Sequence, residues 1–221
     1  MRKSLLISVA SLVSLLAFAQ NNVVNSGNGN LLGRDYVDLG LPSGLKWATC
    51  NVGASKPEEY GDYFAWGEVK PAPSNDYSEE NCSAYGVRTS ELKERGVVDA
   101  NNELADKYDA ATSNWGKGWR MPTEEEFKEL LNSCVWEWDN LEGVDGYKVS
   151  SKVNSNWIFL PAAGYRIGTS SGNVGSNGGY WSSTVYESNS YRAYYLYFNS
   201  SSKRTLSSSR YDGHTVRPVS E

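Results

Sequence analysis

The sequence has few residues of the types that most often carry chemistry or bind polyanions. It contains one histidine and three cysteines, and its 21 basic side chains are outnumbered by 26 acidic ones. Because phosphate groups and anionic membrane surfaces are bound by basic faces, this balance argues against nucleic acid and an anionic membrane as partners. The sequence also lacks the P-loop, the Gly-x-Ser-x-Gly turn of hydrolases and the His-Glu-x-x-His motif of metalloproteases.

The three cysteines, Cys50, Cys82 and Cys134, do not have the spacing of a zinc site. In an exported protein two of them could form a disulfide and leave one free thiol, or all three could stay free. Three pairings are possible and the sequence does not choose among them, so the disulfide is open at this point.

Long hydrophobic runs are absent except at the start of the chain. Arg2 and Lys3 precede an apolar run from Leu5 to Ala19, which ends in Ala-Phe-Ala before Gln20. This is the pattern of a secretory signal peptide spanning residues 1–19, and the run is short for a membrane-spanning helix. The residue directly after the cleavage point is Gln20 and not a cysteine, so a bacterial lipoprotein anchor is not expected. We therefore expect a secreted, periplasmic or cell-surface protein with no membrane insertion after signal removal.

The expected mature chain, Gln20 to Glu221, has 202 residues and a formal charge of −7. This length suits one domain. Residues 20–33 are rich in Asn and Gly and predict a flexible leader, so the domain is expected to span residues 34–221. In "YVDLGLPSGLKWATCNVGA", apolar and polar residues alternate around a Pro-Ser-Gly turn, which predicts two paired strands. Residues 70–100 have no sustained period and predict a long irregular loop.

Residues 104–115 predict a first helix, because apolar side chains recur there at helical spacing. The helix is expected to stop at Gly116. Its periodicity places Asp106 and Asp109 on a solvated face.

A second helix is predicted after Thr123, which forms a Thr-x-x-Glu capping box with Glu126. Apolar residues then recur at helical spacing from Phe127 to Cys134, and acidic residues fill the first turn, where the helix dipole favours them. This function at the start of a helix explains the run of three glutamates without a catalytic role.

After this helix, short strand-like segments are separated by turns of Gly, Asn and Ser, and "GTSSGNVGSNGG" predicts a loop. Helices fall in the first half and strands dominate the second, which predicts an α+β fold rather than alternating βαβ units. We expect two helices packed on small antiparallel sheets with long irregular loops.

Several sequence strings, taken in order, resemble one family. The strings are "YVDLGLPSGLKWATCNVGA", "GDYFAWGE", "GWRMPTEEEF", "IFLPAAGYR", "YWSS", "AYYLYF" and "VRPV", between about Asp35 and Val219. They resemble the DUF1566 or Fibrobacter succinogenes major paralogous domain family, in the version common in Bacteroidetes. The resemblance implies a C-type lectin-like fold, similar to the formylglycine-generating enzyme and to the variable proteins of diversity-generating retroelements. In those variable proteins the last strands and loops form a ligand-binding face.

The end of the chain has the composition of such a face. Seven of the fifteen tyrosines lie between Tyr180 and Tyr211, whereas all eight tryptophans lie at or before Trp181. Tyr offers a rigid ring with one hydroxyl, and Ser and Asn offer adaptable hydrogen bonds, which is the mixture that recognition loops use. A half-exposed sheet with Tyr and Ser on its wet face is the alternative explanation.

Strand periodicity divides "RAYYLYFN" into two faces. Tyr194, Leu196 and Phe198 form the better core face, so Tyr195 and Tyr197 are expected to point outward. Further polar residues are expected at loop or edge positions, namely Ser201, Lys203, Ser208, Arg210 and Tyr211. The candidate ligand-binding residues are Tyr186, Asn189, Tyr191, Tyr195, Tyr197, Asn199, Ser201, Tyr211 and Asp212.

No cofactor or catalytic site is expected. His214, the one histidine, follows Gly213 and is expected at an exposed turn without a catalytic role. The resemblance does not bring formylglycine chemistry, which uses cysteines near the end of the fold, because the last cysteine here is Cys134. "YWSS" replaces the Trp-Asn-Asp strand of calcium-dependent lectins, so calcium-mediated sugar binding is not expected, whereas a structural calcium at loops such as "NDYSEEN" stays open.

The sequence thus predicts a secreted, non-catalytic ligand-binding protein, whose ligand is a surface glycan or a protein or peptide. A refinement is that it is a target protein diversified by a retroelement. The main alternative is a structural or envelope interaction module without a dedicated ligand site. An enzyme with an unrecognised site is a third hypothesis, for which the sequence offers no motif.

Overall fold

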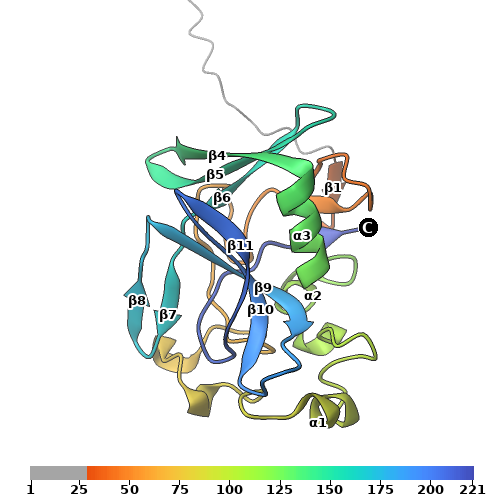
Figure 1. Cartoon of the computed structure of the whole chain (residues 1–221), viewed down its shortest axis with the longest axis vertical. Helices are drawn as coiled ribbons and strands as arrows, with labels where there is room; N and C mark the ends of the chain where they lie inside the picture. Colours follow the sequence, from red (N-terminus) through yellow and green to blue (C-terminus); the bar gives the residue numbers. More distant parts are fainter. Residues whose placement is uncertain (1–28) are drawn as a thin grey trace, which may run out of the picture.

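The computed structural model describes residues 29–221 (Figure 1). The expected signal peptide, and the expected leader as far as residue 28, lie outside these residues. The described chain has three α-helices, three short 3-10 helices and twelve strands, and the strands form four small antiparallel sheets. This arrangement of few helices and several small antiparallel sheets confirms the α+β class.

The two ends of the described chain meet in one sheet. Its strands are ordered β1 (Gly29–Leu31), β2 (Arg34–Asp38), β3 (Lys46–Ala48) and β12 (Val219–Ser220). β2 and β3 are the predicted strand pair around the Pro-Ser-Gly turn. β1 pairs with β2, so residues 29–33 of the expected flexible leader belong to the folded sheet.

The second predicted helix is confirmed as α3 (Glu124–Ser133) with its capping box. The Thr123 hydroxyl accepts the backbone N–H of Glu126 at 3.1 Å, and the Glu126 carboxylate accepts the backbone N–H of Thr123 at 2.8 Å. Phe127 and Leu130 are fully buried on the face that the apolar period predicted. The helix therefore begins and packs where its sequence specifies.

The first predicted helix is shorter than expected, because α2 (Ala110–Trp115) begins six residues later. Asp109 caps it by accepting the backbone N–H of Thr112 at 2.8 Å, and it also accepts the backbone N–H of Met121 at 2.8 Å. Asp109 is buried rather than solvated, so that expectation was wrong. Burial raises the pKa of Asp109 to about 6, against the lowering effect of these hydrogen bonds.

The predicted loop over residues 70–100 contains three short helices. They are the 3-10 turns Pro73–Asn75 and Glu79–Asn81 and the helix α1 (Thr89–Glu94). α1 buries Leu92. Because it spans only six residues, it is too short to produce a hydrophobic period that could be recognised in the sequence.

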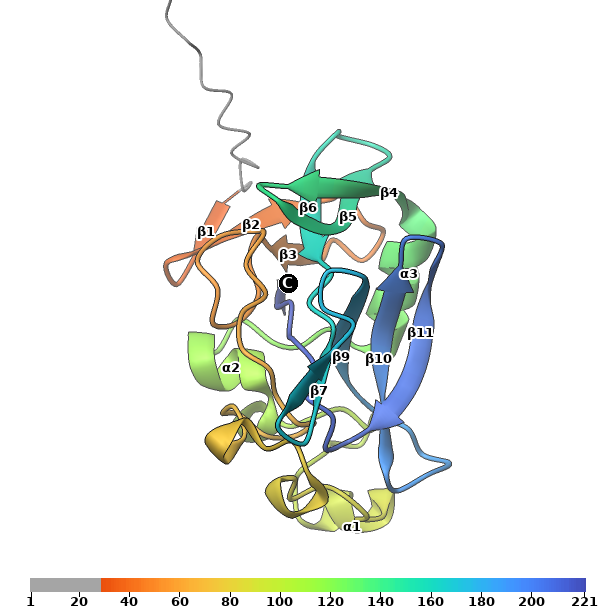
Figure 2. The same ribbon diagram turned by 90° about the vertical axis from the view of Figure 1, so that its left-hand side faces the viewer.

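The middle of the chain forms two further sheets. β4 (Cys134–Leu141), β5 (Val144–Ser151) and β6 (Trp157–Pro161) form a meander. β7 (Tyr165–Ile167) and β8 (Ser170–Gly172) form a hairpin, and β8 lies in the segment that was predicted to be a loop. That hairpin lies beside β9, as Figure 2 shows, and Gly164 bridges to Gly178 in the first residues of β9.

The sheet of β9 (Asn177–Val185), β10 (Arg192–Asn199) and β11 (Ser202–Ser209) separates two hydrophobic clusters. One face packs on α3, and its Leu196 and Phe198 are fully buried. In Figure 1 the β7–β8 hairpin lies on the side of this sheet away from α3. The tyrosine-rich strand β10 therefore has one face in the core beside α3 and the other face on the side of the β7–β8 hairpin.

Candidate functional site

Three predicted residues of β10 lie on the face of the central sheet away from α3. Tyr195, Tyr197 and Asn199 alternate with the buried Leu196 and Phe198, as the period of two predicted. We call the side of the sheet that carries Tyr195, Tyr197 and Asn199 the tyrosine face. Their partners across the β10–β11 ladder, which share this face, are Leu206, Arg204 and Ser202.

Tyr194 was predicted to belong to the core, but it is only half-buried. Its ring packs edge-on against Tyr186, with 5.1 Å between the ring centroids. Tyr186, a predicted site residue, therefore lies with Tyr194 on the α3 side of β10 rather than with the tyrosine face. Asn189 and Ser201 are exposed in the turns at the two ends of β10, where Asn189 accepts the backbone N–H of Tyr191 at 2.9 Å.

His214 is buried, so the expectation of an exposed turn was wrong. It is 3% exposed because its backbone pairs with Phe64, and the chain around it runs through the interior. Its imidazole packs between two aromatic rings. Tyr195 stacks on it with 4.6 Å between centroids and 9° between planes, and Trp181 meets it edge-on at 4.6 Å.

The buried imidazole is neutral and unpaired. Burial lowers the pKa of His214 to about 3, so the ring carries no charge at neutral pH. Neither of its nitrogens has a hydrogen-bond partner among residues 29–221. Buried polar atoms without partners are rare and costly in native proteins, so this position calls for an explanation.

A small pocket opens beside this ring, between the β7–β8 hairpin and strands β9 and β10. Its volume is about 150 Å³. We call it the His214 pocket, and its lining residues are Gly164, Tyr165, Asn173, Asn177, Gly178, Gly179, Tyr195, Tyr197 and His214. The inner residues Gly178, Gly179 and His214 are buried, whereas Asn173 and Asn177 lie at the rim. Two predicted site residues, Tyr195 and Tyr197, therefore line one cavity.

Glycine is required at the inner end of this pocket. A Cβ added to Gly179 would lie 2.4 Å from Nδ1 of His214, and one added to Gly178 would lie 2.0 Å from the Phe198 ring. Both distances are shorter than any van der Waals contact, so a side chain at either position would displace a buried ring.

The hydroxyl of Tyr197 has an unused proton. It accepts the side-chain amide of Asn199 at 3.0 Å and that of Asn177 at 3.4 Å, which occupies both lone pairs. The Asn199 carbonyl oxygen in turn accepts the backbone N–H groups of Ser201 and Ser202, at 3.0 and 2.8 Å. Asn199 and Ser201 therefore orient the Tyr197 hydroxyl, which is left as a donor at the pocket rim.

A second group of tyrosines, the tyrosine cluster, consists of Tyr85, Tyr191 and Tyr211. The ring of Tyr85 lies 4.9 Å from that of Tyr191 and 5.0 Å from that of Tyr211, measured between centroids. Tyr191 is half exposed, and the backbone bond from Arg210 to its carbonyl extends the β10–β11 ladder. The structure thus brings together the two predicted residues Tyr191 and Tyr211.

Tyr85 is a member of this cluster that the sequence did not reveal. It lies more than 100 positions before Tyr191, in the segment that was predicted to be an irregular loop. No periodicity or motif marks it. Only the folded chain, which packs this loop against the end of β10, places its ring beside the other two.

Arg210 holds that loop in place, although it was predicted at a loop or edge position. Its guanidinium is fully buried and donates to the carbonyls of Ala84 and Val87, at 2.7 and 2.8 Å, and to the carbonyl of Arg192 at 3.0 Å. It also stacks over the ring of Trp66 at 5.1 Å. Burial lowers the pKa of Arg210 to about 10, which leaves it a cation at neutral pH.

Asp212 is buried rather than exposed in a loop. One carboxylate oxygen accepts the hydroxyl of Ser208, and the other has no hydrogen-bond partner among the described residues. Burial raises the pKa of Asp212, against the lowering effect of Ser208. The charge of Asp212 also raises the pKa of Tyr195, a minor contribution beside burial, so the two side chains are neighbours.

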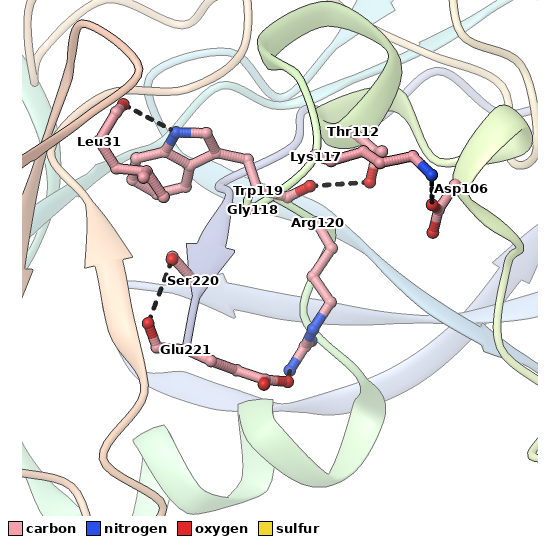
Figure 3. A pocket seen from close by; sticks show the side chains of 9 residues that line it. All are labelled: Leu31, Asp106, Thr112, Lys117, Gly118, Trp119, Arg120, Ser220 and Glu221. Atoms are coloured by element: carbon pink, nitrogen blue, oxygen red, sulfur yellow. Dashed lines mark hydrogen bonds and ion pairs between the residues drawn. The ribbon is translucent and has the colours of Figure 1, made fainter.

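Two larger hollows hold none of the tyrosine-face residues. One, of about 440 Å³, lies between β1, the segment before α3 and the last residues (Figure 3). There the Trp119 indole donates to the Leu31 carbonyl at 3.1 Å, the Thr112 hydroxyl donates to the Trp119 carbonyl at 2.7 Å, and Arg120 lies 3.7 Å from the Glu221 carboxylate. These polar groups are used by contacts that tie the terminal sheet to α2.

The other hollow, of about 410 Å³, lies at the start of α3 and is lined by Tyr194 and several carboxylates. Of these, Glu124 pairs with Lys128 at 2.6 Å and accepts the Thr205 hydroxyl at 2.7 Å. Burial raises the pKa of Glu103 in the same hollow. The Glu124 carboxylate of this hollow is therefore engaged by contacts within the protein, and no tyrosine-face residue lines the hollow.

The cysteines and carboxylates were the remaining candidates for chemistry. All three cysteines are free thiols, which answers the question of pairing, and burial raises the pKa of Cys82 to about 12 and that of Cys134 to about 11. Within residues 29–221, no three His, Cys, Asp or Glu side chains are grouped as a metal site would need.

In the same residues, no helix has both the length and the apolar character needed to cross a membrane.

Comparison with known proteins identifies one similar family, described as a domain of unknown function, DUF8237, which matches residues 136–219. The matched segment runs from β4 to β12 and holds all nine predicted site residues. No curated protein and no solved structure matches the chain. The resemblance to the DUF1566 or Fibrobacter succinogenes family was wrong, because the family found is DUF8237 and no DUF1566 match accompanies it.

Proposed function

We propose that this protein is a non-catalytic binding protein whose ligand lies along the tyrosine face and the tyrosine cluster. The observation that carries the proposal is the position of Tyr191, Tyr195 and Tyr197. Tyr195 and Tyr197 line one pocket, and Tyr191 joins Tyr85 and Tyr211 at the end of the same strand. Tyrosine rings with available hydroxyls supply large contact area at low entropic cost, which favours recognition.

A glycan is the ligand class that these residues favour. The rings offer apolar faces on which a sugar ring can stack, and the Tyr197 hydroxyl and Asn177 amide offer neutral hydrogen-bonding groups beside them. Binding rather than catalysis is favoured by the surroundings of His214. A general base needs an orienting carboxylate, and no carboxylate among residues 29–221 bonds to its nitrogens.

The proposal includes an exported protein with a C-type lectin-like fold. Export is supported by the signal-peptide pattern of residues 1–19, which is typical of periplasmic, cell-surface or secreted proteins. The fold assignment is supported by helices, small antiparallel sheets and long irregular loops, with the first and last described strands in one sheet. The binding proposal depends on the tyrosine residues and does not require this fold assignment.

The test is to screen residues 20–221 on a mixed array of glycans and bacterial surface proteins, with and without a calcium chelator. We expect glycan hits that survive chelation. Hits on proteins or peptides alone would contradict the glycan assignment, and hits lost on chelation would contradict a metal-free site. If the protein binds nothing on the array but co-purifies stably with an envelope complex, a structural module would be favoured.

A further inference from the structure

The His214 pocket has the size of a chemical substituent rather than of a whole ligand. Its volume of about 150 Å³ corresponds to roughly five water molecules at about 30 Å³ each. A group of four or five non-hydrogen atoms therefore fits, while the rest of a ligand would lie outside on the tyrosine face. A pocket of this kind selects one substituent of a larger molecule.

The Tyr197 hydroxyl at the rim of the pocket can bind a ligand. The Tyr197 hydroxyl keeps a proton to donate, because both lone pairs are occupied by the amides of Asn177 and Asn199. The backbone carbonyl of Asn177 accepts the N–H of Gly164 at 2.7 Å, so the Tyr197 hydroxyl is the rim group that we assign to ligand binding. A hydrogen-bond donor at the mouth of a small uncharged pocket matches an acetyl group, whose carbonyl oxygen can accept the donor while its methyl group enters the pocket.

The inner end of the pocket is uncharged, and its one polar side chain is the neutral imidazole of His214. It is formed by the backbones of Gly178 and Gly179 and by the ring of His214, which Tyr195 covers on one face. No charged side chain lines the pocket. A carboxylate or ammonium group that entered would lose its hydration without gaining a counter-ion, whereas a methyl group would gain contacts.

We propose that the His214 pocket is a subsite for the acetamido group of an N-acetylated amino sugar. Its methyl group lies against Gly178, Gly179 and the imidazole, and its carbonyl accepts the Tyr197 hydroxyl. The sugar ring lies outside on the tyrosine face. The choice of an amino sugar rests on the proposed function, while the choice of an acetyl group rests on the pocket alone.

The experiment uses the histidine as a reporter. His214 is the one histidine of the chain, so protein with 15N-labelled histidine gives one assigned set of imidazole signals. The probes are the methyl glycosides of N-acetylglucosamine, glucosamine and glucose, with an N-acetyl-lysine peptide as a fourth. We expect a saturable shift with the N-acetylglucosamine glycoside, with a dissociation constant on the order of 1 mM for so small a ligand.

The assignment of the acetamido group is tested by comparing the affinities of the probes and of two variants. We expect the glycosides without an acetyl group to bind at least about tenfold more weakly. Tyr197→Phe should weaken binding about fivefold through the lost hydrogen bond to the ligand, in a protein that stays folded. Tyr194→Phe, on the opposite face of the same strand, is the matched control and should leave affinity unchanged.

Several outcomes would overturn the proposal. Equal shifts with the glucose and N-acetylglucosamine glycosides would show that the acetamido group is not recognised. A response to the acetyl-lysine peptide alone would show that the ligand is not a sugar. If no probe moves the His214 signals while array hits still depend on the tyrosine cluster, this subsite is wrong and the proposed function stands. If both experiments are negative, both proposals fail.

Discussion

The ring of Tyr195 lies flat on the imidazole of His214, with 4.6 Å between centroids and 9° between planes. This contact joins a strand residue of β10 to the buried segment near the end of the chain. It sets the inner wall of the pocket and keeps the imidazole away from water. Its consequences for pH, stability and binding can be measured separately.

The first prediction concerns the pH dependence of stability. The folded pKa of His214 is about 3, below the ordinary value near 6.5, so the unfolded chain takes up the proton first as the pH falls. The contribution of the neutral ring is complete above pH 6.5 and is lost progressively toward pH 3. Between pH 7 and 5, wild type should lose about 2 kcal/mol relative to His214→Phe.

Urea denaturation of both proteins at the two pH values measures this difference. The comparison with the variant matters because Asp109, whose folded pKa is raised to about 6, changes stability in the opposite direction over part of the same range. That effect is common to both proteins and cancels. An imidazole that titrates near pH 6.5 in the folded protein would contradict the burial.

The second prediction concerns Arg210. Arg210→Met removes three hydrogen bonds and leaves the carbonyls of Ala84, Val87 and Arg192 without that donor, so we expect a loss of about 3 kcal/mol in the free energy of unfolding. Arg204→Met, at an exposed arginine of β11, is the control and should change stability by less than about 0.5 kcal/mol. Equal effects of the two changes would show that Arg210 does not hold the Tyr85 loop.

A third prediction tests the separation of the fold from the site. Thr123→Ala removes the hydroxyl cap of α3 and should cost about 1 kcal/mol, while Thr123→Ser should be nearly neutral. Because α3 packs on the face of the sheet opposite to the tyrosine face, ligand binding should be unchanged in both variants. Chemical denaturation and the array measure the two effects. Loss of binding in Thr123→Ala would place part of the site at α3.

A fourth prediction concerns Gly179. In Gly179→Ala the new Cβ would lie 2.4 Å from Nδ1 of His214, so the ring must move, at a cost of about 1–3 kcal/mol. The imidazole signals should shift and their response to the N-acetylglucosamine glycoside should disappear. Gly175→Ala, which meets no atoms but has a positive φ of 78°, should cost about 1 kcal/mol and leave those signals unchanged. An unaltered response in Gly179→Ala would show that the pocket is not used.

The parts of this fold that were predictable depend on short-range patterns. The capping box of Thr123 and Glu126 and the alternation of Leu196 with Tyr197 are complete within a few residues, and both appear in the structure as predicted. The prediction that Asp109 is solvated was wrong because its hydrogen-bond partner, the backbone N–H of Met121, lies twelve positions away. A contact at that distance is not part of the helical period from which the prediction was made.

The site was predictable only in part, for the same physical reason. Tyr195 and Tyr197 follow from strand alternation, but the burial of His214 depends on pairing with Phe64, about 150 positions earlier. Tyr85 joins Tyr191 through a loop with no recognisable pattern. Long-range contacts of this kind leave no local periodicity in a sequence. The contacts of His214 with Phe64 and of Tyr191 with Tyr85 therefore could not be predicted.

The most direct test of the binding proposal is the affinity of an array hit for two double variants. Tyr191→Ala with Tyr211→Ala removes two rings of the tyrosine cluster, while Tyr186→Ala with Tyr194→Ala removes two rings on the α3 side of β10. The proposal predicts at least about a tenfold loss of affinity in the first variant, since interface tyrosines often contribute more than 1 kcal/mol each, and little change in the second. Equal affinity of the first variant and wild type, with both folded, would contradict it.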